Sequence, residues 1–233
     1  MSNIRLFHPE NIIENTTSLL SKEHTHYVVN VMRLKRGSII NFFNKDGEWK
    51  SEIVFLDKER VEVKFLKRIK KASNLSKIEL AICLVKKNPM EIILQKATEL
   101  GVSKIIPIIS ERTEIKDLNY SRANKIIIEA TEQSNQFNIP KLEQVNKLKE
   151  FISSLSDDDI VLFANINSNK KIDFKNLDKK KRIIVLIGPE GDFSTKEIEL
   201  ILSKKNILSF SLSKNILRTE TAVITALSII NYF

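Results

Sequence analysis

The chain has 233 residues and a formal net charge of +9, because 38 side chains are lysine or arginine and 29 are aspartate or glutamate. Hydrophobic residues make up 42% and charged residues 29%, a balance typical of folded globular domains. The longest apolar runs fall well short of the ~20 residues of a membrane-spanning helix, so we expect no membrane partner. The N-terminal residues lack the apolar core of a signal peptide, and the single cysteine, Cys83, allows no internal disulfide. We therefore expect a cytoplasmic protein of one or two domains.

The positive charge suggests an anionic partner, with nucleic acid the first candidate. A lysine-rich proteome would produce the same surplus, so the charge alone leaves both explanations open. Residues 1–74 contain 14 basic and 9 acidic side chains, a net of +5, and residues 75–233 contain 24 and 20, a net of +4. The charge is therefore denser in the first third of the chain.

Residues 37–66 have the pattern of short β-strands. Apolar and charged residues alternate over Val61–Phe65, which is the period of a half-buried strand. Asn44–Gly47 separates two apolar segments and predicts a hairpin loop, in which the glycine is free to adopt a positive φ. The next segment, Lys67–Lys77, is polar, basic and without a period, and we expect it to be a linker.

After this segment, short apolar strands alternate with amphipathic helices. Asn88 is expected to cap the first helix, with Pro89 in its first turn and Gly101 at its end. The alternation favours a mostly parallel α/β sheet with helices on both faces. The predicted strands are Ile78–Val85, Lys104–Ile109, Ile160–Ala164, Ile183–Ile187 and Ile207–Leu212. Four helices are predicted: one that starts at Asn88, one over Ser121–Gln136, one capped by Ser194 and Glu197, and one over Thr219–Tyr232.

Ligands of open parallel sheets bind beyond the carboxyl ends of the strands. Three loops that follow predicted strands have an unusual composition: Asn165–Asn169, Gly188–Phe193 and Ser213–Thr221. The second contains two of the five glycines of the chain, so its backbone can approach a nucleoside closely. It has neither the P-loop nor the G-x-G-x-x-G pattern, and an ordinary strand-to-helix turn would have a similar composition.

The third loop ends at the start of an apolar helix with Arg218, Thr219 and Glu220. A helix N-terminus has free N–H donors, so an arginine there could hold an anionic or electron-rich group. The simpler alternative is that Thr219 only caps the helix. The polar residues Glu129, Glu132, Gln133 and Ser134 on the helix Ser121–Gln136 are most simply explained as a solvated face.

The remaining chemical motifs are weak. All three histidines precede the predicted α/β elements, and no cysteine or acidic cluster has the spacing of metal ligands, so no metal site is expected. A G-x-S-x-G motif is absent, and Cys83 lies within a predicted strand, so nucleophilic catalysis by serine or cysteine has little support.

Five segments stand out in order along the chain: HYVVNVMRLKRG (26–37), QKATELGV (95–102), EATEQS (129–134), IGPEGDFS (187–194) and NILRTETA (215–222). Together they resemble the RsmE family of ribosomal RNA small-subunit methyltransferases, which act on the imide nitrogen N3 of uridine 1498 in 16S rRNA. Three places depart from the family pattern: Asp192 replaces the second glycine of GPEGG, Leu212–Asn215 differs from LG-x-R, and Asn135-Gln136 lacks the arginine of EQSGR.

The resemblance implies an architecture that periodicity could not indicate. Residues 75–233 would form a SPOUT methyltransferase domain, an α/β parallel sheet with a trefoil knot that binds S-adenosylmethionine. Residues 1–70 would form a small PUA-like β-barrel that binds RNA. The protein would be a homodimer that acts on 16S rRNA of the 30S ribosomal subunit.

The resemblance also implies roles for individual residues. Arg218 would stabilise the charge that spreads onto the uridine carbonyl oxygens when the imide loses its proton, and Glu220 would be either the base or the group that orients Arg218. The implied cofactor-binding residues are Leu162, Ala164, Leu186, Ile187, Gly188, Pro189, Glu190, Gly191, Leu212, Ile216, Leu217 and Thr221. The implied RNA-binding residues are Arg5, Arg33, Lys35 and Arg36, with Arg112 and Arg122 as weaker candidates.

Two other functions stay open at this point. The chain could be a SPOUT methyltransferase with another target, either a different base nitrogen or a ribose hydroxyl, which nucleoside mapping of rRNA from a deletion strain would reveal. It could also be an inert RNA-binding or assembly factor, which would give no heat on titration with S-adenosylmethionine. The intact segments Gly188–Gly191 and Arg218–Glu220 favour the enzyme.

Overall fold

The computed structural model describes residues 4–72, 76–168, 172, 177–178 and 180–232. The chain divides into two compact units: Met1–Asn74 with Thr131–Asn138, and Leu75–Ala130 with Ile139–Phe233. The short stretch Thr131–Asn138 thus belongs with the first unit, although the sequence analysis placed it in a continuous second domain. The end of the loop Asn165–Asn169 and part of the segment Lys67–Lys77 lie outside the described residues.

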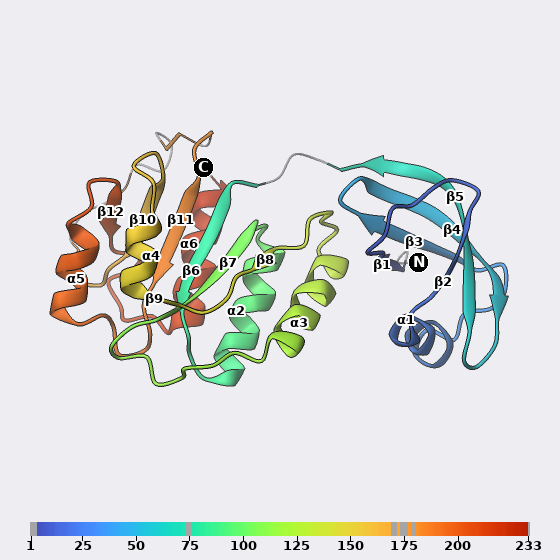
Figure 1. Cartoon of the computed structure of the whole chain (residues 1–233), viewed down its shortest axis with the longest axis horizontal. Helices are drawn as coiled ribbons and strands as arrows, with labels where there is room; N and C mark the ends of the chain where they lie inside the picture. The colour runs from blue at the N-terminus through green and yellow to red at the C-terminus, as the bar shows by residue number, and fades with distance from the viewer. Residues whose placement is uncertain (1–3, 73–75, 169–171, 173–176, 179, 233) are drawn as a thin grey trace. The chain divides into compact units, whose positions relative to one another are not determined.

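The first unit is built on a five-stranded sheet (Figure 1). Its strands have the order β1-β3-β4-β5-β2, in which β1 pairs in parallel with β3 and the other pairs are antiparallel. Phe42, Trp49 and Phe65 lie in its buried core. The elements are β1 (Arg5–Phe7), β2 (Thr17–Leu19), α1 (Lys22–His26), the π-helix η1 (Tyr27–Val31), β3 (Ile39–Asn44), β4 (Gly47–Leu56) and β5 (Val61–Lys71).

The predicted hairpin is confirmed, whereas the predicted linker is partly wrong. Gly47 has a φ of 146°, and a Cβ atom there would lie 2.2 Å from the carbonyl oxygen of Lys70, so the turn requires glycine. The strand β5 continues to Lys71, well into the segment Lys67–Lys77. Its last five residues are all exposed, and a strand without a buried face has no alternation of apolar and polar residues to reveal it.

Arg5 corrects one expectation, because the resemblance places it among the RNA contacts and the structure buries it. Its side chain is 4% exposed, and Nε donates to Oε2 of Glu48 at 3.2 Å. Nη1 donates to the carbonyl oxygen of Thr131 at 3.1 Å, and Nη2 donates to that of Gln136. The guanidinium carbon lies 3.5 Å from the centroid of the Phe43 ring. Arg5 therefore serves the core of the first unit and is not free to contact RNA phosphates.

Glu132 was expected on a solvated face, but its carboxylate is bound to other residues of the first unit. Its Oε1 accepts a hydrogen bond from the backbone N–H of Phe7 at 2.9 Å and lies 3.6 Å from Nε2 of His24. The expected helix Ser121–Gln136 ends at Gln133, as α3 (Tyr120–Gln133). The EATEQS segment therefore fastens the stretch Thr131–Asn138 to the rest of the first unit.

The second unit contains a parallel sheet with the order β12-β10-β11-β6-β7-β8, and β9 also pairs with β7. Every pair in this sheet is parallel, which confirms the predicted parallel sheet. The strands are β6 (Ile78–Cys83), β7 (Lys104–Ile109), β8 (Lys141–Leu142), β9 (Asn146–Lys147), β10 (Ile160–Ala164), β11 (Ile183–Ile187) and β12 (Ile207–Phe210). The helices are α2 (Lys87–Glu99), α3, α4 (Leu148–Ser154), α5 (Thr195–Leu202) and α6 (Thr219–Tyr232).

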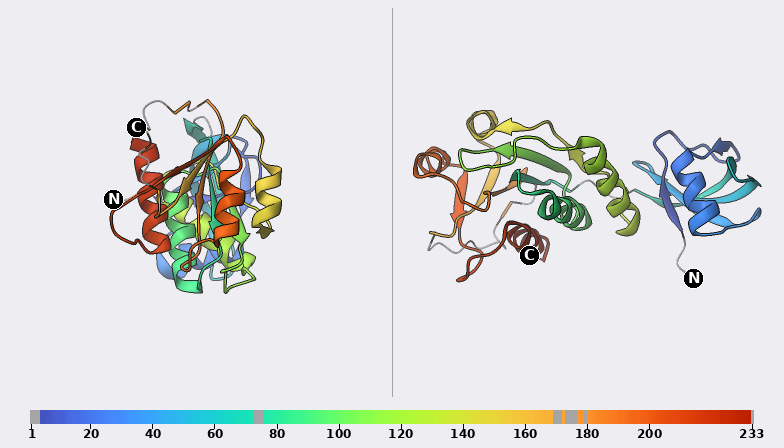
Figure 2. Two further views of the ribbon diagram at one scale, coloured as in Figure 1. Left: turned by 90° about the vertical axis from the view of Figure 1, so that its left-hand side faces the viewer. Right: turned by 90° about the horizontal axis from the view of Figure 1, so that it is seen from below.

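Helices cover both faces of this sheet, as the left view of Figure 2 shows for α2 and α6 on one side and α4 and α5 on the other. The strands supply both cores because successive side chains point to opposite faces. Val185 and Ile187 pack with α2, α3 and α6, whereas Ile184 and Leu186 pack with α4 and α5. The α/β fold class is thereby confirmed, and the trefoil knot stays a prediction.

Apart from α3, whose observed bounds are given above, the helix ends agree with the sequence analysis except at the N-terminus of α2. Gly101, with a φ of 79°, follows α2 as predicted. The expected cap by Asn88 is wrong, because α2 begins at Lys87 and Asn88 lies within its first turn. Ser194 and Glu197 form the predicted reciprocal cap of α5. None of the helices in the described part of the chain is long and apolar enough to cross a membrane.

We expect Arg5→Met to lower the free energy of unfolding of the first unit by about 3 kcal/mol, because it leaves the buried Glu48 carboxylate without its closest cation. The fluorescence of Trp49, the single tryptophan of the chain, reports on this unit during urea denaturation. Arg36→Met is the matched control at an exposed arginine and should change stability by no more than about 0.5 kcal/mol. Adding Glu48→Gln to Arg5→Met should recover part of the lost free energy of unfolding. Equal stabilities of Arg5→Met and the wild type would contradict the structural role of Arg5.

Candidate active site at the carboxyl end of the parallel sheet

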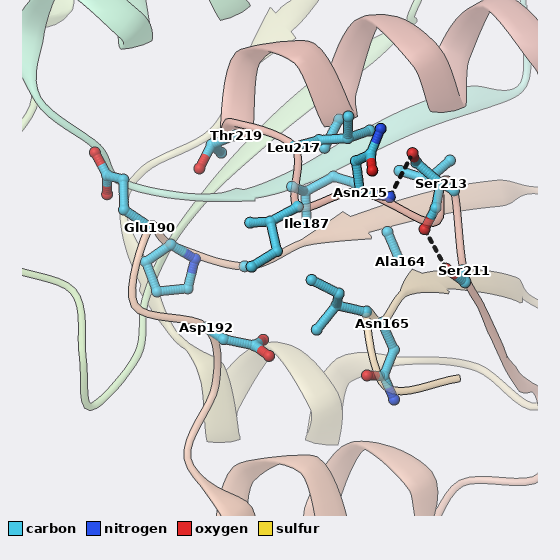
Figure 3. Close-up of a pocket in the computed structure, with 16 residues that line it drawn as sticks. Ala164, Asn165, Ile187, Glu190, Asp192, Ser211, Ser213, Asn215, Leu217 and Thr219 are labelled. Carbon is cyan, nitrogen blue, oxygen red and sulfur yellow. Dashed lines mark hydrogen bonds between the residues drawn. The ribbon is translucent and has the colours of Figure 1, made fainter. Parts of the chain in front are cut away.

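The three loops singled out in the sequence meet at one pocket (Figure 3). They follow β10, β11 and β12, and the sheet order β12-β10-β11 places these three strands side by side. The hollow is open to solvent on one side and has both apolar and polar side chains in its lining, as ligand sites usually do. It is lined by Ala164, Asn165, Ile166, Ile187, Gly188, Pro189, Glu190, Asp192, Ser211, Leu212, Ser213, Asn215, Ile216, Leu217, Thr219 and Ala222.

The loop after β11 is shaped by Asp192 and Phe193. The backbone N–H of Asp192 donates to the carbonyl oxygen of Pro189 at 3.0 Å, and Asp192 has a φ of 59°. Its Oδ1 accepts from the N–H of Phe193 at 2.7 Å. A Cβ atom on Gly188 would lie 3.1 Å from the buried ring of Phe193. The glycine therefore lets Phe193 pack beneath the loop, and Asp192 supplies the left-handed residue that closes the turn.

Neighbouring side chains brace this loop from outside the pocket. Nη1 of Arg112 donates to the carbonyl oxygen of Gly191 at 2.9 Å. Glu197 is buried, and its Oε1 accepts from the N–H of Glu111 at 2.8 Å while its Oε2 accepts from the N–H of Ser194 at 2.9 Å. The loop after β7 and the start of α5 therefore hold the loop after β11 in place.

Short polar side chains fix the two other loops. Nδ2 of Asn165 donates to Oγ of Ser209 at 3.2 Å, which joins the ends of β10 and β12. Oγ of Ser211 donates to the carbonyl oxygen of Ser213, and Oγ of Ser213 accepts from the N–H of Asn215, both at 3.0 Å. The dashed lines of Figure 3 mark these last two bonds. The loop after β12 thus has a defined shape at the pocket.

The lining fits a nucleoside that carries a positive charge, as S-adenosylmethionine does. Ile187, Leu212 and Leu217 provide apolar surface for a heterocyclic ring. Asp192 and Asn165 provide a carboxylate and an amide elsewhere in the lining, whereas the carboxylate of Glu190 points away from them (Figure 3). Apolar walls with a few polar groups are the usual composition of a cofactor pocket.

Some of the expected cofactor-binding residues line the pocket and others do not. Leu162 and Leu186 are fully buried in the cores on opposite faces of the sheet, because side chains within these strands point into the helix layers. Gly191 and Thr221 are exposed neighbours of lining residues. The expected residues that do line the pocket are Ala164, Ile187, Gly188, Pro189, Glu190, Leu212, Ile216 and Leu217.

The sequence analysis did not assign several lining residues to the cofactor. Most belong to the loops that it singled out, so the composition of those loops could have revealed them. Ser211 and Ala222 had no such indication, because they lie just before the third loop and within the apolar helix α6. The residues missed are Asn165, Ile166, Asp192, Ser211, Ser213, Asn215, Thr219 and Ala222.

The expected catalytic residues, Arg218 and Glu220, do not line the pocket but are next to lining residues in the chain. Arg218 is exposed and stands between Leu217 and Thr219, which both line the pocket, and Glu220 is half-buried in the first turn of α6. Cys83 is fully buried, and burial raises the pKa of its thiol to about 12, so the thiol stays protonated near neutral pH. Within the described residues, no group of three or more histidine, cysteine and acidic side chains could hold a metal ion.

The expected RNA-binding residues differ in their surroundings. Arg33, Lys35 and Arg36 are exposed before β3. Arg112 is exposed but donates to the loop after β11, as described above. Arg122 forms two hydrogen bonds with the carboxylate of Glu91, at 3.2 and 3.0 Å, and this pairing lowers the pKa of Glu91.

Comparison with known proteins covers nearly the whole chain. A model described as an RNA methyltransferase PUA domain matches residues 20–66, and one described as an RNA methyltransferase domain matches residues 70–231. Ribosomal RNA small subunit methyltransferase E of Rickettsia conorii is 33% identical over 229 residues, which are 96% of this chain and 93% of that protein.

Two solved structures are similar along their full lengths. A methyltransferase of Legionella pneumophila in complex with the cofactor SAM is 31% identical, with a TM-score of 0.90 over 100% of this chain and 98% of that chain. A ribosomal RNA small subunit methyltransferase E of Neisseria gonorrhoeae bound to S-adenosyl methionine is 27% identical, with a TM-score of 0.89 over 99% and 97%.

The left-handed turn predicts an ordered series of substitutions at position 192. Asp192→Ala should lower the free energy of unfolding by about 1–2 kcal/mol, because it removes the bond to the N–H of Phe193 and places a Cβ residue without polar compensation in the left-handed region. The free energy of unfolding of Asp192→Asn should stay near that of the wild type. Asp192→Gly should lower it by less than Asp192→Ala does. Urea denaturation followed by far-ultraviolet circular dichroism measures these differences, and an equal loss for glycine and alanine would contradict the role of the backbone angle.

Proposed function

Because the chain belongs to the ribosomal RNA small subunit methyltransferase E family, it is an S-adenosylmethionine-dependent rRNA methyltransferase, and we propose that its target is the imide nitrogen N3 of uridine 1498 in 16S rRNA. One structural observation carries the proposal: the three loops at the carboxyl end of the sheet line a single pocket with apolar walls and a few polar groups. The target position is taken from the family.

The pocket residues bind and orient the cofactor. S-adenosylmethionine supplies an electrophilic methyl group on a sulfonium when bound. Ile187, Leu212 and Leu217 would hold its adenine ring between apolar surfaces, and the backbone of Gly188–Gly191 would provide N–H and C=O groups at close approach. The braced loop after β11 keeps these groups in position before the cofactor arrives, which reduces the ordering cost of binding.

Arg218 would act on the uridine and not on the cofactor. The imide nitrogen is a weak nucleophile until it loses its proton, and the charge then spreads onto the two flanking carbonyl oxygens. A guanidinium at the rim of the pocket would stabilise that charge, as the donors of an oxyanion hole do. Glu220, in the first turn of the same helix, would accept the imide proton or orient Arg218.

The substrate must present the uridine unpaired, because base pairing occupies the imide edge. We propose that exposed Arg33, Lys35 and Arg36 hold the RNA backbone, with Arg112 and Arg122 as further contacts. The proposal extends to the assembled 30S subunit as substrate, to a cytoplasmic location, and to a homodimer. The exposed apolar side chains of Ile216 and Tyr232 support a partner subunit, since they are 85% and 84% exposed.

The target is tested by incubating the enzyme with unmodified small ribosomal subunits and labelled S-adenosylmethionine, and then mapping the labelled nucleotide. We expect the label on the base of uridine 1498 at N3. Label on another base or on a ribose would identify a methyltransferase with a different target. Titration of the protein with S-adenosylmethionine separates both outcomes from an inert RNA-binding factor, which would give no heat.

We expect Arg218→Ala to lower the rate of methylation by about 10² or more, the loss found when one oxyanion donor is removed. The affinity for S-adenosylmethionine should stay nearly intact, because Arg218 lies beside the pocket lining. Lys214→Ala is the matched control, since Lys214 is an exposed cation of the same loop. Unchanged turnover in Arg218→Ala would remove Arg218 from the mechanism.

A further inference from the structure

The far end of the β4–β5 hairpin forms a basic surface, mostly in a segment that the sequence analysis assigned to a linker. We name it the basic ribbon and define it by Lys50 of β4 and by Lys67, Arg68, Lys70 and Lys71 of β5. All four β5 residues are exposed, and Lys50 is half-buried opposite Lys67. The ribbon is a paired strand segment from Lys50↔Lys67 to Gly47↔Lys71, with one register shift between Glu48 and Trp49 that leaves Ile69 without a partner on β4.

Two acidic side chains lie beside the ribbon and offset only part of its charge. Oε1 of the exposed Glu14 accepts a hydrogen bond from the backbone N–H of Arg68 at 2.9 Å. The carboxylate of Glu48 lies 3.9 Å from Nζ of Lys70, but Glu48 is 3% exposed and also binds Arg5 at 3.2 Å and Asn41 at 2.7 Å. The negative charge of Glu48 is therefore compensated inside the core. The side chain of Lys70 stays 59% exposed and can attract a second anion.

The ribbon presents cations on both of its faces. Lys67 and Lys70 pair with Lys50 and Glu48 and share one face, whereas Arg68 and Lys71 pair with Trp49 and Gly47 and share the other, because the extra residue Ile69 shifts the alternation. The ladder of backbone hydrogen bonds fixes these positions. A rigid row of exposed Lys and Arg side chains suits a chain of phosphates, which such residues bind without reading the bases.

The ribbon lies apart from the cations Arg33, Lys35 and Arg36. These precede β3, where the N–H of Gly37 donates to the carbonyl oxygen of Ile53 at 2.8 Å. The ribbon lies beside the opposite end of β3, where Asn44 pairs with Gly47. A six-residue strand spans about 20 Å, so the two groups would contact different phosphates.

We propose that the basic ribbon is a second phosphate-binding surface for the RNA substrate, separate from the surface around Arg33 and Arg36. The proposal rests on the proposed function for the identity of the RNA. The ribbon neutralises phosphates on one part of the RNA backbone, and the surface around Arg33 and Arg36 neutralises phosphates elsewhere. Base recognition remains with the pocket of the second unit.

The test uses the full-length protein and measures its binding to unmodified small ribosomal subunits over a range of KCl concentrations. Lys67→Gln with Lys71→Gln removes one charge from each face of the ribbon. Lys22→Gln with Lys58→Gln removes two charges from exposed lysines of α1 and of the opposite hairpin end, and it is the matched control. Circular dichroism and Trp49 fluorescence verify that both variants keep the fold.

We call Lys67→Gln with Lys71→Gln the ribbon pair, and Lys22→Gln with Lys58→Gln the control pair. The ribbon pair should weaken binding about tenfold near 0.1 M salt. The slope of log affinity against log salt should become about 1.5 units less steep, since each lost phosphate contact contributes roughly 0.7–0.9 to it. The control pair should change the slope little. Arg33→Ala with Arg36→Ala should flatten the slope by a similar and additive amount. An unchanged slope in the ribbon pair, or an equal change in both lysine pairs, would overturn the proposal.

Two further measurements separate this inference from the proposed function. The affinity for S-adenosylmethionine should be the same in the ribbon pair and the wild type, because the ribbon belongs to the other unit. The KM for small subunits should rise by about the same factor as the Kd, with kcat unchanged. If the wild type labels a different nucleotide while the ribbon pair still loses RNA affinity, the proposed target is wrong but the proposed role of the ribbon is supported.

Discussion

The adjacency of three parallel strands is the constraint on which the site depends. Parallel strands that lie side by side must end at the same edge, and here β10, β11 and β12 are neighbours although about 20 residues separate each from the next along the chain. The strand order alone therefore brings their loops together at one edge of the sheet. The pocket follows from strand order, and strand order follows from the helices that must cover both faces of the sheet.

Packing behind the loops converts this convergence into a defined pocket. Phe193 fills the core next to Phe163, with ring centroids 5.6 Å apart, and its ring needs the space left by Gly188. Asp192 closes the turn with a left-handed backbone, a conformation that aspartate tolerates better than most residues. The family pattern has a glycine at this position, which adopts the left-handed region readily, and the aspartate adds a carboxylate to the lining.

The first unit shows that environment, and not residue type, decides what a basic side chain does. Arg5 and Lys70 both approach Glu48, yet Arg5 is enclosed by Phe43 and three backbone carbonyl groups, whereas Lys70 extends into solvent. Burial makes Arg5 a structural residue with a stability cost for its loss. Exposure leaves Lys70 and its neighbours available to phosphates, which is the property that the basic ribbon exploits.

Local elements could be predicted from the amino-acid sequence, because they depend on periodicity and on backbone chemistry that a short window contains. The strands Ile160–Ala164 and Ile183–Ile187, the helix Thr219–Tyr232, the turn at Gly47 and the three candidate loops were all predictable in this way. Long-range packing, in contrast, sets the burial of Arg5, the inward orientation of Leu162 and Leu186, the continuation of β5 to Lys71 and the place of Asp192 in the pocket. Each of these depends on which distant residues pack against the position, and long-range packing leaves no mark on the neighbouring sequence.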